Sequence, residues 1–245
     1  PYLDKLVFRV IPDMASRMMA MENKEADLYP ELENAANIDR MQKKAYLKAT
    51  REGFSLIGPL SWLEFNTTKK PFNKKTVRQA ISYAIDRKFV TQSLFRGKAA
   101  IATGPIAPGT PYYSANVNHY NLNLDKANKM LDEAGYPKGA DGIRFKMTID
   151  AEVHPDMLQQ YLTSQLKKIG IDVNARVSPD FASWADRTTH GKHDATVNIV
   201  YNWGDPVIGV HRTYITSNIK DGVPYSNTSQ YSNPEIDALL EKAGK

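Results

Sequence analysis

The residues best suited to hold a small molecule lie directly after a predicted strand, in the run Tyr201-Asn202-Trp203-Gly204-Asp205-Pro206. Tyrosine and tryptophan supply flat apolar walls, while asparagine and aspartate supply oriented polar groups. Glycine lets the backbone approach a ligand closely. Ligands of open α/β sheets bind where strands end. We therefore take Tyr201, Asn202, Trp203 and Asp205 as candidate ligand contacts, with a strand-end turn that buries Trp203 as the alternative.

A second and weaker candidate of the same kind lies in the segment 98–123. This segment contains Gly104-Pro105, Pro108-Gly109 and Pro111, which predict a loop. A loop of this length is either functional or packed on another part of the protein. Its adjacent aromatic residues, Tyr112 and Tyr113, are the candidate ligand contacts.

Residues for catalysis or metal binding are poorly represented. His190 and His193 have a spacing that could share a metal ion on a helix, but Gly191 disfavours a helix and no third ligand is placed nearby. We interpret both as surface histidines. The chain has no cysteine, and it lacks the glycine-rich nucleotide loops and the Gly-x-Ser-x-Gly motif. We expect a protein that is not an enzyme and that needs no cofactor or metal.

The composition is that of a folded globular protein. Hydrophobic residues make up 42% of the chain and charged residues 24%, which is sufficient for a core and argues against disorder. No apolar run is long enough to span a membrane. The net charge of +5 is spread along the chain, so it does not favour a nucleic-acid partner.

Hydrophobic periodicity predicts elements that alternate along the chain. Strands are expected at 6–11, 27–29, 54–57, 60–66, 144–149, 171–177 and 195–201. Helices are expected at 14–26, 38–50, 77–97, 123–134, 154–168 and 181–187, and another begins near 236. This order predicts a mixed α/β (α+β) fold, with right-handed crossovers between parallel strands.

The segment 63–87 carries a recognisable motif. It reads Leu-Glu-Phe-Asn-Thr, then Pro-Phe-Asn at 71–73, then Val-Arg-Gln-Ala-Ile-Ser-Tyr-Ala-Ile-Asp-Arg at 77–87. This resembles the signature of the peptide/nickel/opine class of extracellular solute-binding proteins, which serve ABC importers. Further segments similar to family motifs occur along the chain in the family's order, at 16–27, 104–108, 124–137 and 166–171. The resemblance covers essentially the whole chain.

The resemblance implies a lobe of the type II periplasmic-binding-protein fold with part of the other lobe. Members of the family are longer, so we expect a part of a longer protein. Residues 1–66 would form part of the first lobe and residues 67–245 most of the second. The implied function is capture of a small solute, foremost an oligopeptide or dipeptide, in a cleft between the lobes. The implied partners are that ligand and the ABC permease subunits, for a monomer located in the periplasm or lipid-anchored outside the cell.

The ligand class depends on how the strand-end run is aligned with the family. Peptide-binding members carry a run like Gly-Trp-x-x-Asp-x-x-Asp-Pro, whose first aspartate pairs with the ligand's amino terminus. Aligned on Asp205-Pro206, this chain places Asn202 at that position, which suits a neutral ligand such as a sugar. Aligned on Trp203, Asp205 is the nearest carboxylate and peptide binding is retained. The alternatives are a non-peptide ligand (sugar, opine or nickel chelate) and a ligand-sensing domain of a transcriptional regulator.

Overall fold

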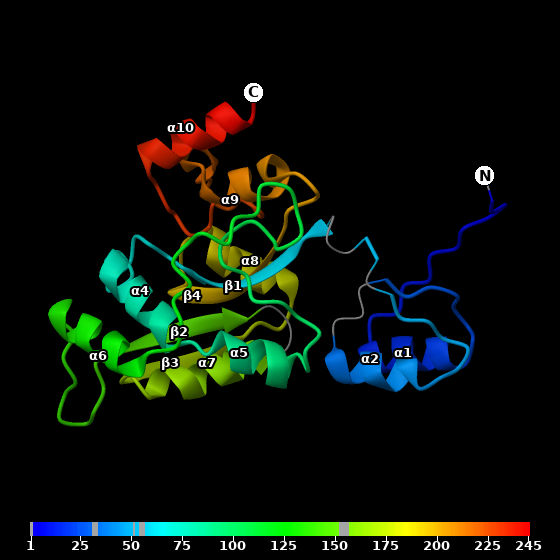
Figure 1. Ribbon diagram of the computed structural model, residues 1–245, viewed down its shortest axis with the longest axis horizontal. Helices are drawn as coiled ribbons and strands as arrows, with labels where there is room; N and C mark the ends of the chain where they lie inside the picture. The colour runs from blue at the N-terminus through cyan, green and yellow to red at the C-terminus, as the bar shows by residue number, and fades with distance from the viewer. Residues whose placement is uncertain (1, 31–33, 51, 54–56, 152–156) are drawn as a thin grey trace. The chain divides into compact units, whose positions relative to one another are not determined.

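The structure is a computed structural model that describes residues 2–30, 34–50, 52–53, 57–151 and 157–245. The chain forms two compact units, residues 1–51 and residues 52–245 (Figure 1). The strand β1 (Pro59–Phe65) pairs within the second unit. The assignment of residues 1–66 and 67–245 to two lobes of a larger protein stays a prediction.

The first unit contains two short helices, each capped at its N-terminus by a polar side chain. In α1 (Met14–Glu22), the Asp13 carboxylate accepts a hydrogen bond from the Ser16 backbone N–H, as expected for a cap. In α2 (Ala35–Gln42), the Asn34 side chain accepts from the Ala36 N–H at 2.8 Å. The helix predicted at 38–50 therefore starts earlier, at this cap, and ends much earlier.

The strand predicted at 6–11 is absent from the structure. These residues take no strand pairing, and Phe8 is 83% exposed. The segment is apolar, but a strand also needs a neighbouring strand, and none pairs with it within the described residues. The short strand predicted at 27–29 is absent too. The strand predicted at 54–57 falls almost wholly outside the described residues.

The second unit is built on a four-stranded sheet with the order β1-β4-β2-β3. The strands β2 (Phe145–Ala151), β3 (Ile171–Val177) and β4 (Ala195–Tyr201) run parallel, while β1 runs antiparallel to β4. The mixed α/β fold and the strands expected at 60–66, 144–149, 171–177 and 195–201 are confirmed. The antiparallel β1 lies at the edge of the sheet, beside the end of β4 that carries the candidate site.

The main hydrophobic core lies between this sheet and three helices, α4 (Lys75–Ala84), α6 (Leu124–Glu133) and α7 (Met157–Lys167). The helix predicted from 77 to 97 is interrupted. Ile85 is extended, and the Asp86 carboxylate caps a new start by accepting from the Phe89 N–H at 3.0 Å. The short α5 (Arg87–Phe89) and the π-helix η1 (Val90–Leu94) follow.

The opposite face of the sheet carries polar residues and is covered by α8 (Phe181–Thr189). Because successive side chains along a strand point to opposite faces, Asp150 and Thr196 lie on this face, where they accept hydrogen bonds from side chains of α8. Beyond β4, the chain forms elements that periodicity did not predict: the π-helix η2 (Val207–His211), α9 (Arg212–Tyr214) and the 3-10 helix η3 (Thr216–Asn218). The final helix, expected near 236, is α10 (Pro234–Ala243).

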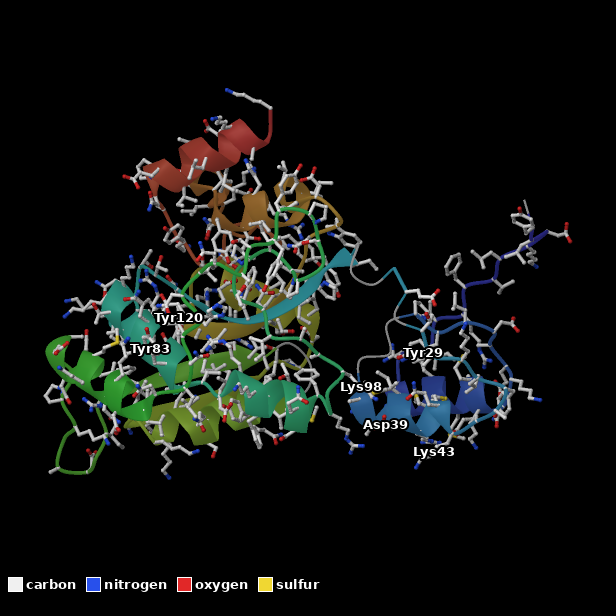
Figure 2. The ribbon with its side chains drawn as sticks, viewed as in Figure 1. Tyr29, Asp39, Lys43, Tyr83, Lys98 and Tyr120 are labelled. Carbon is white, nitrogen blue, oxygen red and sulfur yellow. The ribbon has the colours of Figure 1, made fainter. Side chains whose placement is uncertain are left out.

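The long segment 98–123 has neither helix nor strand, as predicted, and its end is packed on α4. The rings of Tyr83 and Tyr120 lie with centroids 5.1 Å apart (Figure 2). The Tyr120 hydroxyl also accepts from the Gln79 side chain at 3.0 Å. The loop is thus fixed to the helical layer at this end. Across the part of the chain that the structure describes, no helix has the length and apolar character that crossing a bilayer requires.

Candidate functional site

The end of β4 is tied to the residues just before β1. The backbone N–H groups of Asn202 and Trp203 donate to the carbonyls of Gly58 and Ile57, at 3.2 and 2.9 Å. Gly58 has a positive φ of 57°, and a Cβ there would lie 3.0–3.1 Å from Thr110, Ala107 and Asn202. Glycine is therefore needed where this strand end meets the long loop.

Asn202 fastens the long loop to this strand end. It is 0% exposed, and its Oδ1 accepts from the Ala107 N–H at 2.6 Å. Its Nδ2 donates to the Pro105 carbonyl at 3.2 Å. Both polar atoms of this predicted ligand contact are thus used within the unit. The arrangement makes Asn202 a residue that positions the loop rather than one that presents a polar group at the surface.

Trp203 lies outside the core. Its side chain is 52% exposed, and its ring centroid lies 5.3 Å from that of Tyr201. Its φ is 55°, a left-handed conformation that is unfavourable for a bulky residue and that is found preferentially at functional sites. Asp205 is exposed and its carboxylate accepts from the Val207 N–H at 2.9 Å, at the start of η2. The strand end therefore displays an aromatic pair beside a carboxylate.

Tyr112 and Tyr113, the candidate ligand contacts of the long loop, come shortly after the residues 105–107 to which Asn202 is hydrogen-bonded. Tyr112 is exposed and has a φ of 67°. The Tyr113 hydroxyl accepts from the Thr103 hydroxyl at 3.1 Å, and its N–H donates to the Thr110 carbonyl. These hydrogen bonds hold the loop together internally, and the Tyr112 ring lies at the surface of the unit.

A cavity of about 40 Å³ lies on the α8 side of the sheet, and sequence reasoning missed it. Its walls come from β1, β4, α8, α9 and the segment 224–228. The lining combines aromatic and hydroxyl side chains with one carboxylate and one guanidinium. The lining includes Trp62, Glu64, Trp184, Asn198, Arg212 and Tyr225. The one sequence signal was the aromatic pair Phe181 and Trp184 on a predicted helix, because α9 and the segment after it were not predicted.

The aromatic wall of this cavity is a connected group. The Phe181 ring lies 5.7 Å from that of Trp184 and 6.3 Å from that of Tyr225, measured between centroids. The guanidinium carbon of Arg212 lies 5.5 Å from the Tyr225 ring centroid. Tyr225 also has a positive φ, 60°. The strained backbone conformation thus recurs at three aromatic residues of the candidate surfaces: Tyr112, Trp203 and Tyr225.

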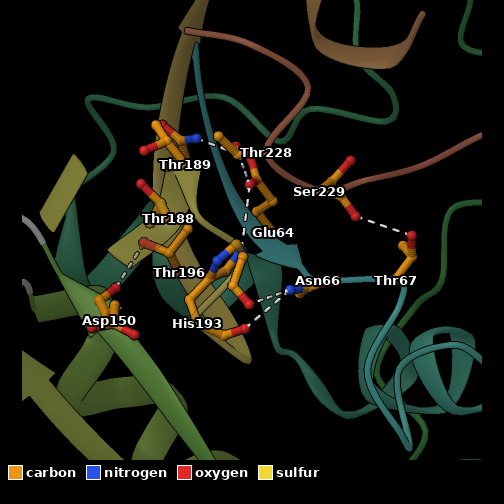
Figure 3. A network of polar contacts seen from close by, with 12 residues as sticks. Glu64, Asn66, Thr67, Asp150, Thr188, Thr189, His193, Thr196, Thr228 and Ser229 are labelled. Carbon is orange, nitrogen blue, oxygen red and sulfur yellow. Dashed lines mark hydrogen bonds and ion pairs between the residues drawn. The ribbon is translucent and has the colours of Figure 1, made fainter. Parts of the chain in front are cut away.

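A buried polar network includes Glu64 and Thr228, which also line the cavity (Figure 3). The Glu64 carboxylate accepts hydrogen bonds from the Thr228 hydroxyl at 2.6 Å and from the Asn198 amide at 2.9 Å. His193 is 0% exposed, and its Nε2 lies 3.9 Å from Glu64 Oε1. Neither ring nitrogen of His193 has a hydrogen-bond partner within the described structure. The network joins β1 to the segment 226–229 next to the cavity.

Burial holds the pKa of the His193 imidazole below its ordinary value of about 6.5, with Lys69 acting in the same direction. The carboxylates of Glu64 and Asp150 oppose this shift. The unfolded chain therefore takes up a proton near pH 6.5 that the folded chain does not. Stability falls as the pH drops below 6.5, until the folded-state pKa is reached.

We predict that His193→Gln reduces this loss of stability, because glutamine does not titrate. The measurement is the free energy of unfolding in urea at pH 7.5 and 5.0, for both proteins. The difference between the two pH values should be smaller in the variant. His119→Gln, at an exposed loop position, should keep the wild-type difference. An equal difference in wild type and His193→Gln would contradict the assignment.

The two histidines considered as a metal pair have separate surroundings. His190 Nδ1 lies 2.8 Å from the Asp221 carboxylate at the surface. His193, interpreted from the sequence as a surface residue, is instead fully buried. The reason is its position just before β4, where the chain enters the sheet. Among the described residues, no three histidine, aspartate or glutamate side chains are grouped to hold a metal ion.

Comparison with known proteins connects these features to a family. Residues 1–227 match the model of the "Bacterial extracellular solute-binding proteins, family 5 Middle". Heme-binding protein A of Haemophilus influenzae is 28% identical over 249 residues, which is 98% of this chain and 43% of that protein. The dipeptide-binding protein of Escherichia coli is 26% identical over 212 residues, 84% of this chain and 38% of that protein.

Solved structures agree with this. The periplasmic binding protein DppA of Helicobacter pylori, in complex with the peptide STSA, superimposes with a TM-score of 0.77 at 26% identity. The match covers 96% of this chain and 44% of that one. The chain therefore spans less than half the length of these relatives. It belongs to the bacterial extracellular solute-binding proteins of family 5.

Proposed function

We propose that the protein containing this chain is the substrate-binding component of an ABC importer. It captures a small peptide in a cleft between two lobes and passes it to the permease subunits. The observation that carries the proposal is the family match over residues 1–227, together with relatives and a solved complex whose names specify peptides. Such a protein acts outside the cytoplasm and performs no covalent chemistry.

The strand end of β4 fits the capture step. The exposed Trp203 ring and the partly buried Tyr201 ring beside it give an aromatic surface on which a ligand can stack, and Asp205 gives a carboxylate for an amine. Asn202 holds the loop 105–107 in register with this surface. We infer that Trp203, Tyr201 and Asp205 contact the ligand, with Tyr112 and Tyr113 on the adjoining loop. This assigns to Asn202 the positioning of the loop.

The experiment is isothermal calorimetry of the complete protein with a panel of peptides, sugars, heme and nickel–histidine chelates. Tight binding of di- or tripeptides, with no binding of the other classes, is the expected result. Tight binding of heme or of a nickel chelate alone would replace the peptide proposal with another ligand class of the same family. Failure to bind any small solute would overturn the proposal.

Trp203 supplies a sharper prediction because its backbone is strained. Trp203→Ala should weaken peptide binding about 5- to 30-fold, since about 1–2 kcal/mol of aromatic contact is lost. Trp203→Gly should weaken binding to the same degree but should be the more stable variant, by about 1 kcal/mol, because glycine tolerates a φ of 55°. Calorimetry and urea denaturation measure the two effects. An alanine variant as stable as the glycine variant would argue against strain at this position.

A further inference from the structure

Tyr83, on α4, carries a phenol oxygen that accepts hydrogen bonds from two side chains. The Lys126 ammonium donates to it at 2.8 Å and the Asn118 amide at 3.3 Å. The same ammonium lies 4.1 Å from the centroid of the Tyr83 ring. A charged donor stabilises a phenolate more than a phenol, because only the phenolate carries a full negative charge. The two donors therefore favour the ionised form of this side chain.

The charge of Lys126 is directed at this phenol. Among the described residues its ammonium makes no ion pair with a carboxylate, whereas Lys129, further along α6, pairs with Glu133 at 3.8 Å. The hydrogen bond from Lys126 is the largest cause that holds the pKa of the Tyr83 phenol below its ordinary value of about 10, followed by the bond from Asn118. Desolvation of the phenolate opposes this lowering of the pKa by a smaller amount.

Backbone hydrogen bonds position the three groups. The Asn123 N–H donates to the Tyr83 carbonyl at 2.8 Å, which ties the start of α6 to the end of α4. The Asn123 side chain caps α6 by accepting from the Lys126 N–H, also at 2.8 Å. Asn118 accepts, through its Oδ1, from the Tyr120 N–H at 3.3 Å. The packing of α4, α6 and the end of the long loop therefore holds the phenol, the ammonium and the amide together.

A second phenol beside the first has no charged donor. The Tyr120 ring lies 5.1 Å from that of Tyr83, between centroids, and both side chains are half-buried (Figure 2). The Tyr120 hydroxyl accepts from the uncharged amide of Gln79 at 3.0 Å. The Arg87 guanidinium donates to two backbone carbonyls here rather than to either phenol. Lys126 is therefore the charged group that distinguishes the two phenols.

We propose that Tyr83 is a covalent modification site for sulfonyl and acyl electrophiles, with its phenol oxygen as the nucleophile and Lys126 as the group that stabilises the ionised phenol. A side-chain nucleophile reacts in its deprotonated form, which a neighbouring cation favours. With a sulfonyl fluoride, the oxygen–sulfur bond forms, the sulfur–fluorine bond breaks and fluoride leaves with the bonding electron pair. The phenol proton passes to water. The site lies on the α4 and α6 side of the sheet, away from the cavity beside α8.

The test labels the complete protein with benzenesulfonyl fluoride at a series of pH values, and peptide mass spectrometry gives the labelling rate at each tyrosine. The Tyr83 rate should rise at a lower pH than the Tyr120 rate. At pH 8 Tyr83 should react about 2- to 5-fold faster than Tyr120, the range for an exposed charge pair. Labelling of Tyr83 no faster than that of Tyr120, or attachment of the probe to Lys126 instead, would overturn the proposal.

Variants of α6 identify the group responsible. Lys126→Gln should move the Tyr83 profile to higher pH and slow its labelling at pH 8 by about 2- to 5-fold, with the Tyr120 rate unchanged as an internal check on the local fold. Lys126→Arg keeps a charged donor and should retain most of the Tyr83 rate. Lys129→Gln removes the same charge from an exposed position of the same helix and should leave both rates unchanged. An unchanged Tyr83 profile in Lys126→Gln would contradict the proposal. Equal slowing in Lys129→Gln would also contradict it, because general surface charge would then be the cause.

Discussion

Asp150→Asn is expected to lower the free energy of unfolding by about 3–5 kcal/mol, the range for breaking a buried ion pair from one side. Asp150 is 0% exposed, and its carboxylate binds Arg176 through two bonds of 2.7 and 2.8 Å. Arg187 on α8 adds a third bond at 2.9 Å. The amide of asparagine cannot accept all three and carries no charge, so two guanidinium groups are left without their counter-ion. Urea denaturation at pH 7 measures the loss.

Asp172→Asn is the matched control. Asp172 lies on β3, beside the strand that carries Asp150, and pairs with Lys146 at 3.6 Å. Both of these side chains are largely exposed, so this pair contributes little, within about 0.5 kcal/mol. Equal losses in the two variants would mean that the Asp150 cluster is not the connection that holds α8 to the sheet.

The strands of the second unit could be predicted because apolar and polar residues alternate along them, and in the fold each strand has a partner strand beside it. The bounds expected for 171–177 and 195–201 are those of β3 and β4. The apolar segment 6–11 shows the limit of the same signal. Its residues have the composition of a strand, yet residues 6–10 are exposed; composition does not reveal whether a partner strand is present.

The sequence singled out the run 201–206 as a candidate site, but it did not show which of these side chains are turned inward. Sequence pointed to the run 201–206 because aromatic and polar residues follow a strand. It could not show that Asn202 is turned inward, since its partners at 105 and 107 lie far away in the chain. Arg212 and Tyr225 were missed for a similar reason. They lie in short helical turns and loops without periodicity, and only the fold brings them to the cavity with Trp62 and Trp184.

Gly209→Ala is the second large expected effect. Gly209 lies in η2, and a Cβ there would lie 1.8 Å from the Tyr201 carbonyl oxygen and 2.8 Å from the Asn202 Cα. The obstructing atoms are backbone, so no side-chain rotation relieves the clash. We expect a loss of stability of about 3 kcal/mol, the upper end of the range for overpacking. Thermal unfolding and urea denaturation measure it.

The matched control separates this contact from the general effect of adding a methyl group. A Cβ at Gly104, in the long loop, would meet no atom within 4 Å, so Gly104→Ala should change stability by less than about 0.5 kcal/mol. Because the backbone at Gly209 packs directly against the backbone of Tyr201 and Asn202, its substitution should also move the strand end and weaken ligand binding. A Gly209→Ala protein with wild-type stability would show that η2 does not pack against the end of β4. The position of Trp203 and of the loop held by Asn202 would then need another explanation.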